Sequence, residues 1–215
     1  MAVLTYQHYA ESVDQTSPSY ADVPIGTASA SRVVVVSIAQ RGVSVSAVHV
    51  GGVSATLAVK DISSFFSFQT EIWYATVPVG STATIVVTTT GQVRWQSIGV
   101  YTGDAITLLD VAQESGSACE LTTVNGGGHV ALIAHAGTLH TWTNATSDFA
   151  EITDPTDADD FAQGASGDSE DGSTVITASG SPGAAFSMCA ASFSGPTQSI
   201  VPQLLLCRRC RSPIL

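Results

Sequence analysis

The sequence has 215 residues, of which 44% are apolar and 12% are charged, and its net charge is −11. A chain of this length can bury a large core without a disulfide scaffold. Its acidity argues against nucleic acid as a partner, because binding a phosphate backbone requires cationic side chains that displace counterions.

The beginning of the sequence, MAVLTYQHYA, lacks the basic and apolar regions of a secretory signal peptide. No stretch approaches the roughly 18 apolar residues of a membrane span. We therefore expect a protein that is made in the cytoplasm of its host cell and has no membrane partner. Residues 1–20 are set apart as an N-terminal segment.

Residues 31–59 are rich in valine and are divided by glycine turns, a pattern that predicts three strands. The continuous apolar run from Val33 to Val36 indicates a strand buried on both faces. Valine and serine alternate over residues 43–46, as in a half-buried strand. Gly51 and Gly52 then predict a tight turn.

Residues 71–103 predict three further strands, after a short helix or turn near residues 61–68. In the third of these strands, Trp95 and Tyr101 share one face, whereas Ile98 and Val100 share the other. We interpret the difference between the faces as that of a sheet with one inner side.

The second half continues with a less regular piece over residues 104–124 and then strands near residues 126–137, 172–180 and 183–195. No internal repeat is evident. Short strands between Gly and Pro turns predict an all-β fold, a two-sheet antiparallel sandwich of jelly-roll-like type over residues 21–195. Residues 196–215 are expected to form an extended C-terminal arm.

Residues 148–171 hold nine of the eighteen acids, and we expect a long solvated loop with one short strand inside it. Clustered carboxylates also suit Ca²⁺. The stretch DSEDGS resembles a Ca²⁺ loop but lacks the acid expected further along. Ca²⁺ in this segment stays an alternative, and no other cofactor and no metal site is expected.

Three histidines lie close together in the sequence, His129, His135 and His140. On an extended strand His129 and His135 share a face but lie about 20 Å apart, at about 3.3 Å per residue. Because they cannot share one metal ion, we expect ordinary hydrogen-bonded histidines. The sequence also lacks a nucleophile elbow and a paired acid and base, so we expect no enzyme.

Three tryptophans are candidates for stacking on a sugar ring. Trp73 and Trp95 lie on predicted central strands and are expected in the core. Trp142, near Asn144, is the candidate for an exposed glycan contact.

The last residues differ from the body of the chain. They hold three of the seven cationic residues and two of the four cysteines. The candidate attachment or cross-linking residues are Leu204, Leu205, Leu206, Cys207, Arg208, Arg209, Cys210 and Arg211. A redox pair, half of a zinc site, interchain cross-links and idle thiols all remain open for the two cysteines.

Several stretches resemble a β-sandwich module of tailed bacteriophages and of particles like gene-transfer agents. They are PIGTASASRVVVVSIA, VSAVHVGGVSAT, VPVGSTATIVVTTTG and SIGVYTG, and the likeness covers roughly residues 20–195. The resemblance implies a virion protein that decorates a capsid or belongs to a head spike or tail appendage. It carries over no catalytic residue.

The expected role is therefore non-enzymatic display on a virion. The expected partners are other virion proteins, further copies of this chain and a bacterial surface glycan. The first alternative is a free carbohydrate-binding module. The second is a hydrolase, which would require acids of residues 148–171 to converge in a pocket with strand residues.

Overall fold

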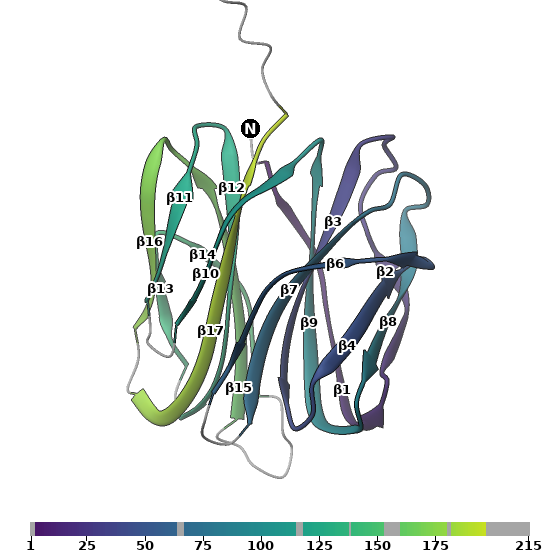
Figure 1. Cartoon of the computed structure of the whole chain (residues 1–215), viewed down its shortest axis with the longest axis vertical. Coiled ribbons are helices and arrows are strands. Elements are labelled where there is room, and N and C mark those ends of the chain that lie inside the picture. Colours follow the sequence, from purple (N-terminus) through teal and green to yellow (C-terminus); the bar gives the residue numbers. More distant parts are fainter. Residues whose placement is uncertain are drawn as a thin grey trace, which may run out of the picture.

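The computed structural model describes residues 3–63, 67–114, 118–137, 139–152, 160–179 and 182–196. None of these residues is helical, and all strand pairs are antiparallel. The strands form four sheets that stack as four layers (Figure 1). The prediction of an all-β sandwich is thus confirmed, with four sheets in place of two, while its jelly-roll type stays a prediction.

The first half of the chain forms two of these layers. The N-inner sheet has the order β1-β9-β3-β7-β6, and the N-outer sheet has the order β2-β8-β4-β5. Their bounds are β1 Thr5–Thr16, β2 Ser19–Pro24, β3 Arg32–Arg41, β4 Val45–Val50, β5 Val53–Ser54, β6 Thr56–Ile62, β7 Phe68–Thr76, β8 Thr82–Thr89 and β9 Gln92–Asp104. We call this pair of sheets the N-sandwich.

The second half forms the C-sandwich. The C-inner sheet has the order β10-β17-β12-β15-β14, and the C-outer sheet has the order β11-β16-β13. Their bounds are β10 Thr107–Glu114, β11 Ala118–Thr123, β12 Gly127–Gly137, β13 Thr141–Thr143, β14 Thr146–Ile152, β15 Asp160–Ser169, β16 Gly172–Ser179 and β17 Pro182–Ser194.

The two sandwiches repeat one strand order. If β10 replaces β1 and the other strands follow in chain order, the N-sandwich sheets become the C-sandwich sheets, and only the two-residue β5 has no counterpart. The expectation that the chain has no internal repeat therefore fails for the topology. A given strand order constrains which faces of each strand are apolar but not which residues stand there. Two halves can therefore share a topology without visible sequence similarity.

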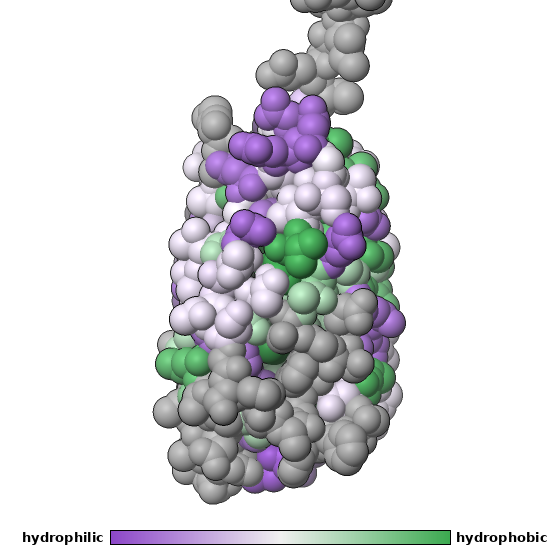
Figure 2. Space-filling view, turned by 90° about the vertical axis from the view of Figure 1, so that its left-hand side faces the viewer, coloured by the Kyte–Doolittle hydropathy of each residue, from purple (hydrophilic) through white to green (hydrophobic). Residues whose placement is uncertain are grey.

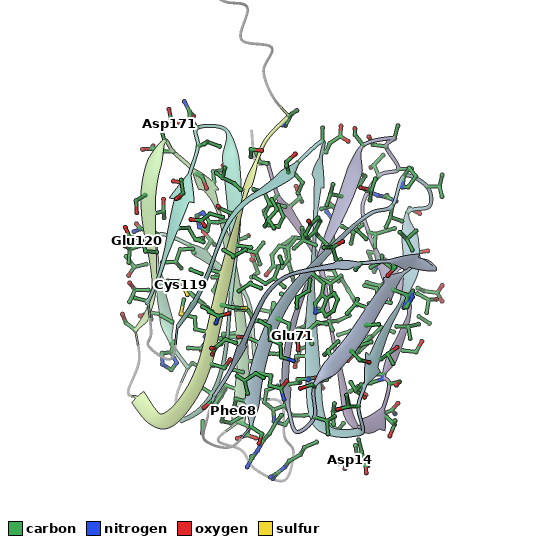
Figure 3. All side chains as sticks on the ribbon, in the orientation of Figure 1. Asp14, Phe68, Glu71, Cys119, Glu120 and Asp171 are labelled. Carbon is green, nitrogen blue, oxygen red and sulfur yellow. The ribbon has the colours of Figure 1, made fainter. Side chains whose placement is uncertain are left out.

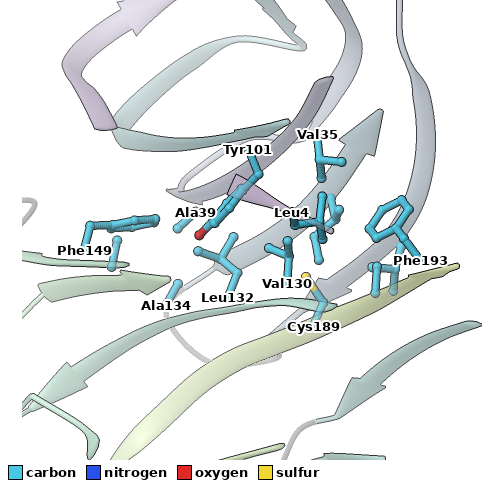
Figure 4. Close-up of a cluster of buried hydrophobic side chains, with 14 of the residues drawn as sticks. Leu4, Val35, Ala39, Tyr101, Val130, Leu132, Ala134, Phe149, Cys189 and Phe193 are labelled. Atoms are coloured by element: carbon cyan, nitrogen blue, oxygen red, sulfur yellow. The ribbon is translucent and has the colours of Figure 1, made fainter. Parts of the chain in front are cut away.

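The core is divided into three layers of apolar side chains. The first lies within the N-sandwich and includes Val34, Ile85 and Ile98. The second joins the two inner sheets, with Tyr101 facing Leu132 (Figure 4). The third lies within the C-sandwich. Both inner sheets are therefore covered on both faces, which corrects the interpretation of one inner side.

The valine run of β3 shows how the sequence produces this stack. Val34 and Val36 point into the N-sandwich, whereas Val33 and Val35 point towards the C-inner sheet. Successive side chains of a strand point to opposite faces, so a strand between two cores must be apolar at every position. The predicted strand buried on both faces is confirmed here. The turn at Gly51 is also present, with a positive φ of 59°.

Two segments differ from their sequence-based description. Residues 5–16, within the segment set apart as 1–20, form β1 at the edge of the N-inner sheet. Residues 107–114 and 118–123, described as less regular, form β10 and β11. The chain passes from one sandwich to the other between Asp104 and Thr107, inside the expected single domain of residues 21–195.

The acidic segment is also more regular than expected. Most of its described residues belong to β14 and β15, and Asp160 is buried with 2% exposure. Burial raises the pKa of Asp148. The prediction of a long solvated loop is therefore wrong for these strands, because the acids alternate with apolar residues such as Phe149 and Phe161 that enter the core.

Candidate functional site

A depression of about 360 Å³ lies at one end of the C-sandwich. It is lined by His129, Asn144, Asp168, Glu170, Asp171, Ser173, Thr174 and Val175. The end of β15 supplies Asp168, the turn between β15 and β16 supplies Glu170 and Asp171, and β16 supplies the hydroxyl groups and the valine. Asp171 lies at this end of the molecule in Figure 3. The acids of DSEDGS thus gather beside side chains of other strands.

Acids of residues 148–171 and strand residues thus converge at the depression, as the hydrolase alternative requires, and two of these acids are hydrogen-bonded to the backbone. Asp171 accepts a hydrogen bond from the backbone N–H of Asn125 at 2.6 Å, and Asp168 accepts one from Val3 at 3.4 Å. These two carboxylates therefore stabilise neighbouring chain segments.

His129 is equally occupied, although it lines the depression. Its Nε2 lies 2.9 Å from the carbonyl oxygen of Asn144, and its Nδ1 lies 3.1 Å from Ser169 Oγ. Burial lowers the pKa of His129, and the Asn144 contact offsets this in part. With both ring nitrogens in contact with the fold, His129 is not placed as a base for a bound molecule.

The other two histidines meet at the opposite end of β12. His135 Nε2 lies 3.2 Å from His140 Nδ1 and 3.0 Å from Gln163 Oε1. Gln163 Oε1 also accepts a hydrogen bond from the backbone N–H of His140. Burial, and after it the neighbouring His140 ring, lower the pKa of His135 to about 4.

The expectation that His129 and His135 are separate, hydrogen-bonded histidines is confirmed. Sequence reasoning missed the contact between His135 and His140. The chain reverses after β12, so residues five apart come together. The described part of the chain contains no cluster of three His, Cys, Asp or Glu side chains able to hold a metal ion.

Buried charges inside the stack serve the fold. Arg32 is 2% exposed and donates hydrogen bonds to the backbone carbonyls of Gly26, Val77, Val79 and Gly80. Glu71, fully buried, accepts a hydrogen bond from the Trp73 indole at 2.7 Å and pairs with Lys60 Nζ at 2.8 Å. Satisfying these charges is what makes their burial tolerable.

The predicted core tryptophans are confirmed, since Trp73 is 7% exposed and Trp95 is fully buried. Trp142 lies on β13, half-buried against the third core layer. Its indole Nε1 is buried and has no hydrogen-bond partner among the described residues. The ring therefore packs mainly on the inner side of the C-outer sheet.

Cys119 and Cys189 are buried in the core as thiols. Burial raises the pKa of the Cys189 thiol, as expected for an inert core cysteine. The predicted attachment residues from Leu204 to Arg211 lie outside the described residues. The candidate cross-link through Cys207 and Cys210 therefore stays a prediction.

No family model matches this chain, and neither a curated protein nor a solved structure matches it. The described residues also contain no helix that could span a membrane.

Proposed function

We propose that the chain is a non-enzymatic structural protein of a bacteriophage virion, displayed on the capsid or on a tail or neck appendage as a decoration, spike or fibre module. The observation that carries this proposal is the union of two sandwiches through a buried layer into one four-layer stack. Such a stack is suited to structural and surface roles, because it presents sheet faces and end loops to its surroundings on a rigid body.

The C-terminal arm supplies the attachment in this proposal. Leu204, Leu205 and Leu206 dock in an apolar groove of a virion protein or of another copy, at about 25 cal/mol per Å² of buried apolar surface. The three arginines pair with acidic surface. Once the particle has left the reducing cell, dissolved oxygen oxidises the thiols of Cys207 and Cys210 to disulfides.

Co-sedimentation with particles tests the attachment. The full chain and a variant with Leu204, Leu205 and Leu206 replaced by serine are added to particles that lack the protein. We expect the full chain to sediment with the particles and the variant to stay in the supernatant with an unchanged circular dichroism spectrum. Equal sedimentation of both proteins contradicts the role of the arm.

The alternative is a free carbohydrate-binding module, and one observation favours it. The depression and the adjoining outer sheet present hydroxyl and carboxylate groups to solvent. A chain that binds a soluble glycan yet does not occur in purified particles would be such a module. A chain that binds the glycan and also occurs in purified particles would instead carry the glycan site as part of its virion role.

A further inference from the structure

The outer face of the C-outer sheet is an array of hydroxyl groups. Along β16 the side chains of Ile176 and Ala178 enter the core, so the alternate residues point to solvent. The outward positions of the three strands are Ala118, Glu120, Thr122, Thr141, Thr143, Ser173, Val175, Thr177 and Ser179. Six of these nine side chains carry a hydroxyl group.

The strand register arranges these side chains in rows. Thr122 is opposite Ser173, Thr141 is opposite Ser179, and Thr177 lies between Ala118 and Thr143. Rows in a sheet are about 4.8 Å apart across the strands and about 6.6 Å apart along them. The face therefore repeats hydroxyl groups at regular intervals in two directions.

At the centre of this face an apolar side chain lies opposite a charged one. Figure 2 views the C-outer sheet from outside and shows a pale surface with a hydrophobic patch near its centre, which has hydrophilic side chains on both sides. Val175 is 43% exposed here, opposite Glu120. Glu120 is the one charged residue among the nine outward positions, and it accepts a hydrogen bond from Ser173 Oγ. Figure 3 shows it pointing away from the stack.

The depression adjoins the same face. Ser173 and Val175 belong to both, while Asn144 and Glu170 extend the lining beyond the strand. The depression thus gives the flat array a polar recess at one end. Its volume of about 360 Å³ lies at the lower end of the range of small-molecule sites.

The size and chemistry of the face indicate which class of ligand it can bind. The strands β11, β13 and β16 have six, three and eight residues. At about 3.3 Å by 4.8 Å for each residue, they cover roughly 270 Å². A stable protein partner needs about 800 Å² on each side, with aromatic residues, Met and Arg at the centre. A second copy of this chain or another folded protein therefore fits poorly. An anionic ligand is disfavoured by the net charge of −11.

We propose that this face and its depression bind a neutral saccharide chain. Serine and threonine hydroxyls both donate and accept hydrogen bonds, as sugar hydroxyls do. The carboxylate of Glu170 accepts hydrogen bonds from sugar hydroxyls in the recess. Val175 packs against the apolar C–H face of a sugar ring. This site deepens the carbohydrate-binding alternative by naming its residues and its ligand class, and it does not depend on the virion role.

Nuclear magnetic resonance of the full ¹⁵N-labelled chain tests the proposal. The probes are dextran, a mannan and a galactan, with heparin as the anionic control. We expect saturable shifts of the Ser173, Val175 and Thr177 amides with at least one neutral polymer and none with heparin. The absence of saturable shifts with all three neutral polymers, or shifts spread over both outer sheets, would overturn the proposal.

Two variants test the named side chains. Val175→Glu adds a charge at an exposed position, and Thr177→Val removes a hydroxyl while keeping the shape. We expect each to weaken binding at least fivefold. The matched control is Thr84→Val, an exposed threonine on the topologically equivalent strand β8. Wild-type affinity of both test variants, with the amide spectrum of a folded protein, would contradict the site.

Discussion

Arg41 on β3 and Asp160 on β15 form an ion pair across the interface of the two sandwiches, with 2.6 Å between Arg41 Nη1 and Asp160 Oδ2. The same carboxylate oxygen accepts a hydrogen bond from the Trp95 indole at 2.9 Å. Arg41 also lies over the Phe68 ring, with 5.5 Å from Cζ to the ring centroid. One acid of the C-sandwich thus binds two side chains of the N-sandwich, Arg41 and Trp95.

Replacing Asp160 by asparagine should destabilise the whole stack. Breaking a buried pair leaves the other charge uncompensated and costs about 3 kcal/mol. Urea unfolding of Asp160→Asn, Arg41→Met and the double variant measures the coupling. We expect the double variant to lose less free energy of unfolding than the sum of the single variants. Strict additivity would show that the pair does not couple the sandwiches.

A larger side chain at Gly99 or Gly164 should disturb the packing of the Phe149 ring. This ring lies against Gly99 of the N-inner sheet and Gly164 of the C-inner sheet, and a Cβ at either position would overlap the ring. We expect Gly164→Ala to lower the free energy of unfolding by about 2 kcal/mol through overpacking. In a Phe149→Ala background the same change should cost far less. An equal cost in both backgrounds would contradict this packing.

Stability should fall as the pH falls from about 6.5 to about 4. The pKa of His135 is about 4 in the folded protein against an ordinary value of 6.5, so the unfolded chain binds more protons in this window. The loss from this one residue amounts to about 3 kcal/mol at the acidic end. Urea unfolding between pH 4 and pH 7 measures it.

The control is His135→Leu, which removes the titratable imidazole and places an apolar side chain at the buried position. Its free energy of unfolding should depend less on pH across this window than that of the wild type. If the slopes of the two proteins coincide, His135 does not account for the acid sensitivity.

Replacing Cys207 and Cys210 by serine should weaken attachment without unfolding the stack. Neither residue belongs to a described strand, whereas the buried Cys119 and Cys189 do. We expect the double variant to dissociate from particles at a lower denaturant concentration, with an unchanged melting temperature of the free protein. Unaltered retention on particles would remove the cross-link from the proposal.

The central strands could be predicted because their sequences carry strong signals. Val33 to Val36 fill two cores, and glycine turns separate β7, β8 and β9. The apolar residues on both faces of β9, Trp95 on one side and Ile98 on the other, already indicated a sheet covered twice. The difference between the two faces nevertheless favours a sheet with a single buried face, which the structure corrects.

The edge strands could not be predicted in the same way. The residues of β1, TYQHYAESVDQT, are half-buried or exposed. The strand is held in the sheet by its backbone pairing with β9. An edge strand needs few apolar residues, so its sequence resembles a loop. The repeat is hidden for a related reason, because the two halves share strand order but not residues.

The two halves also face each other as subunits of a symmetric dimer do. Tyr9 on β1 packs against Phe149 on β14, with ring centroids 5.0 Å apart, and β6 contacts β10 on the other side. Under the repeat β1 corresponds to β10 and β14 to β6, so the two contacts are equivalent. Such an exchange is typical of isologous interfaces, and only the folded chain reveals it.

The saccharide site was not predicted, although the sequence pointed to three of its acids as a Ca²⁺ alternative. The stretch DSEDGS drew attention to Asp168, Glu170 and Asp171, which do line the depression. The hydroxyl array was missed because it needs the register between β11, β13 and β16, strands that are up to about 60 residues apart in the chain. The sequence favours Trp142 as the glycan contact, but this side chain packs beneath the hydroxyl array, against the third core layer.

Peptide mass identification in purified native particles, combined with gels run with and without reductant, tests the central claim most directly. We expect peptides of this chain to occur in the particles and an oligomeric band to shift to about 22 kDa on reduction. A monomeric band in both lanes would keep the virion role and remove the disulfide. Absence of the chain from the particles would contradict the claim.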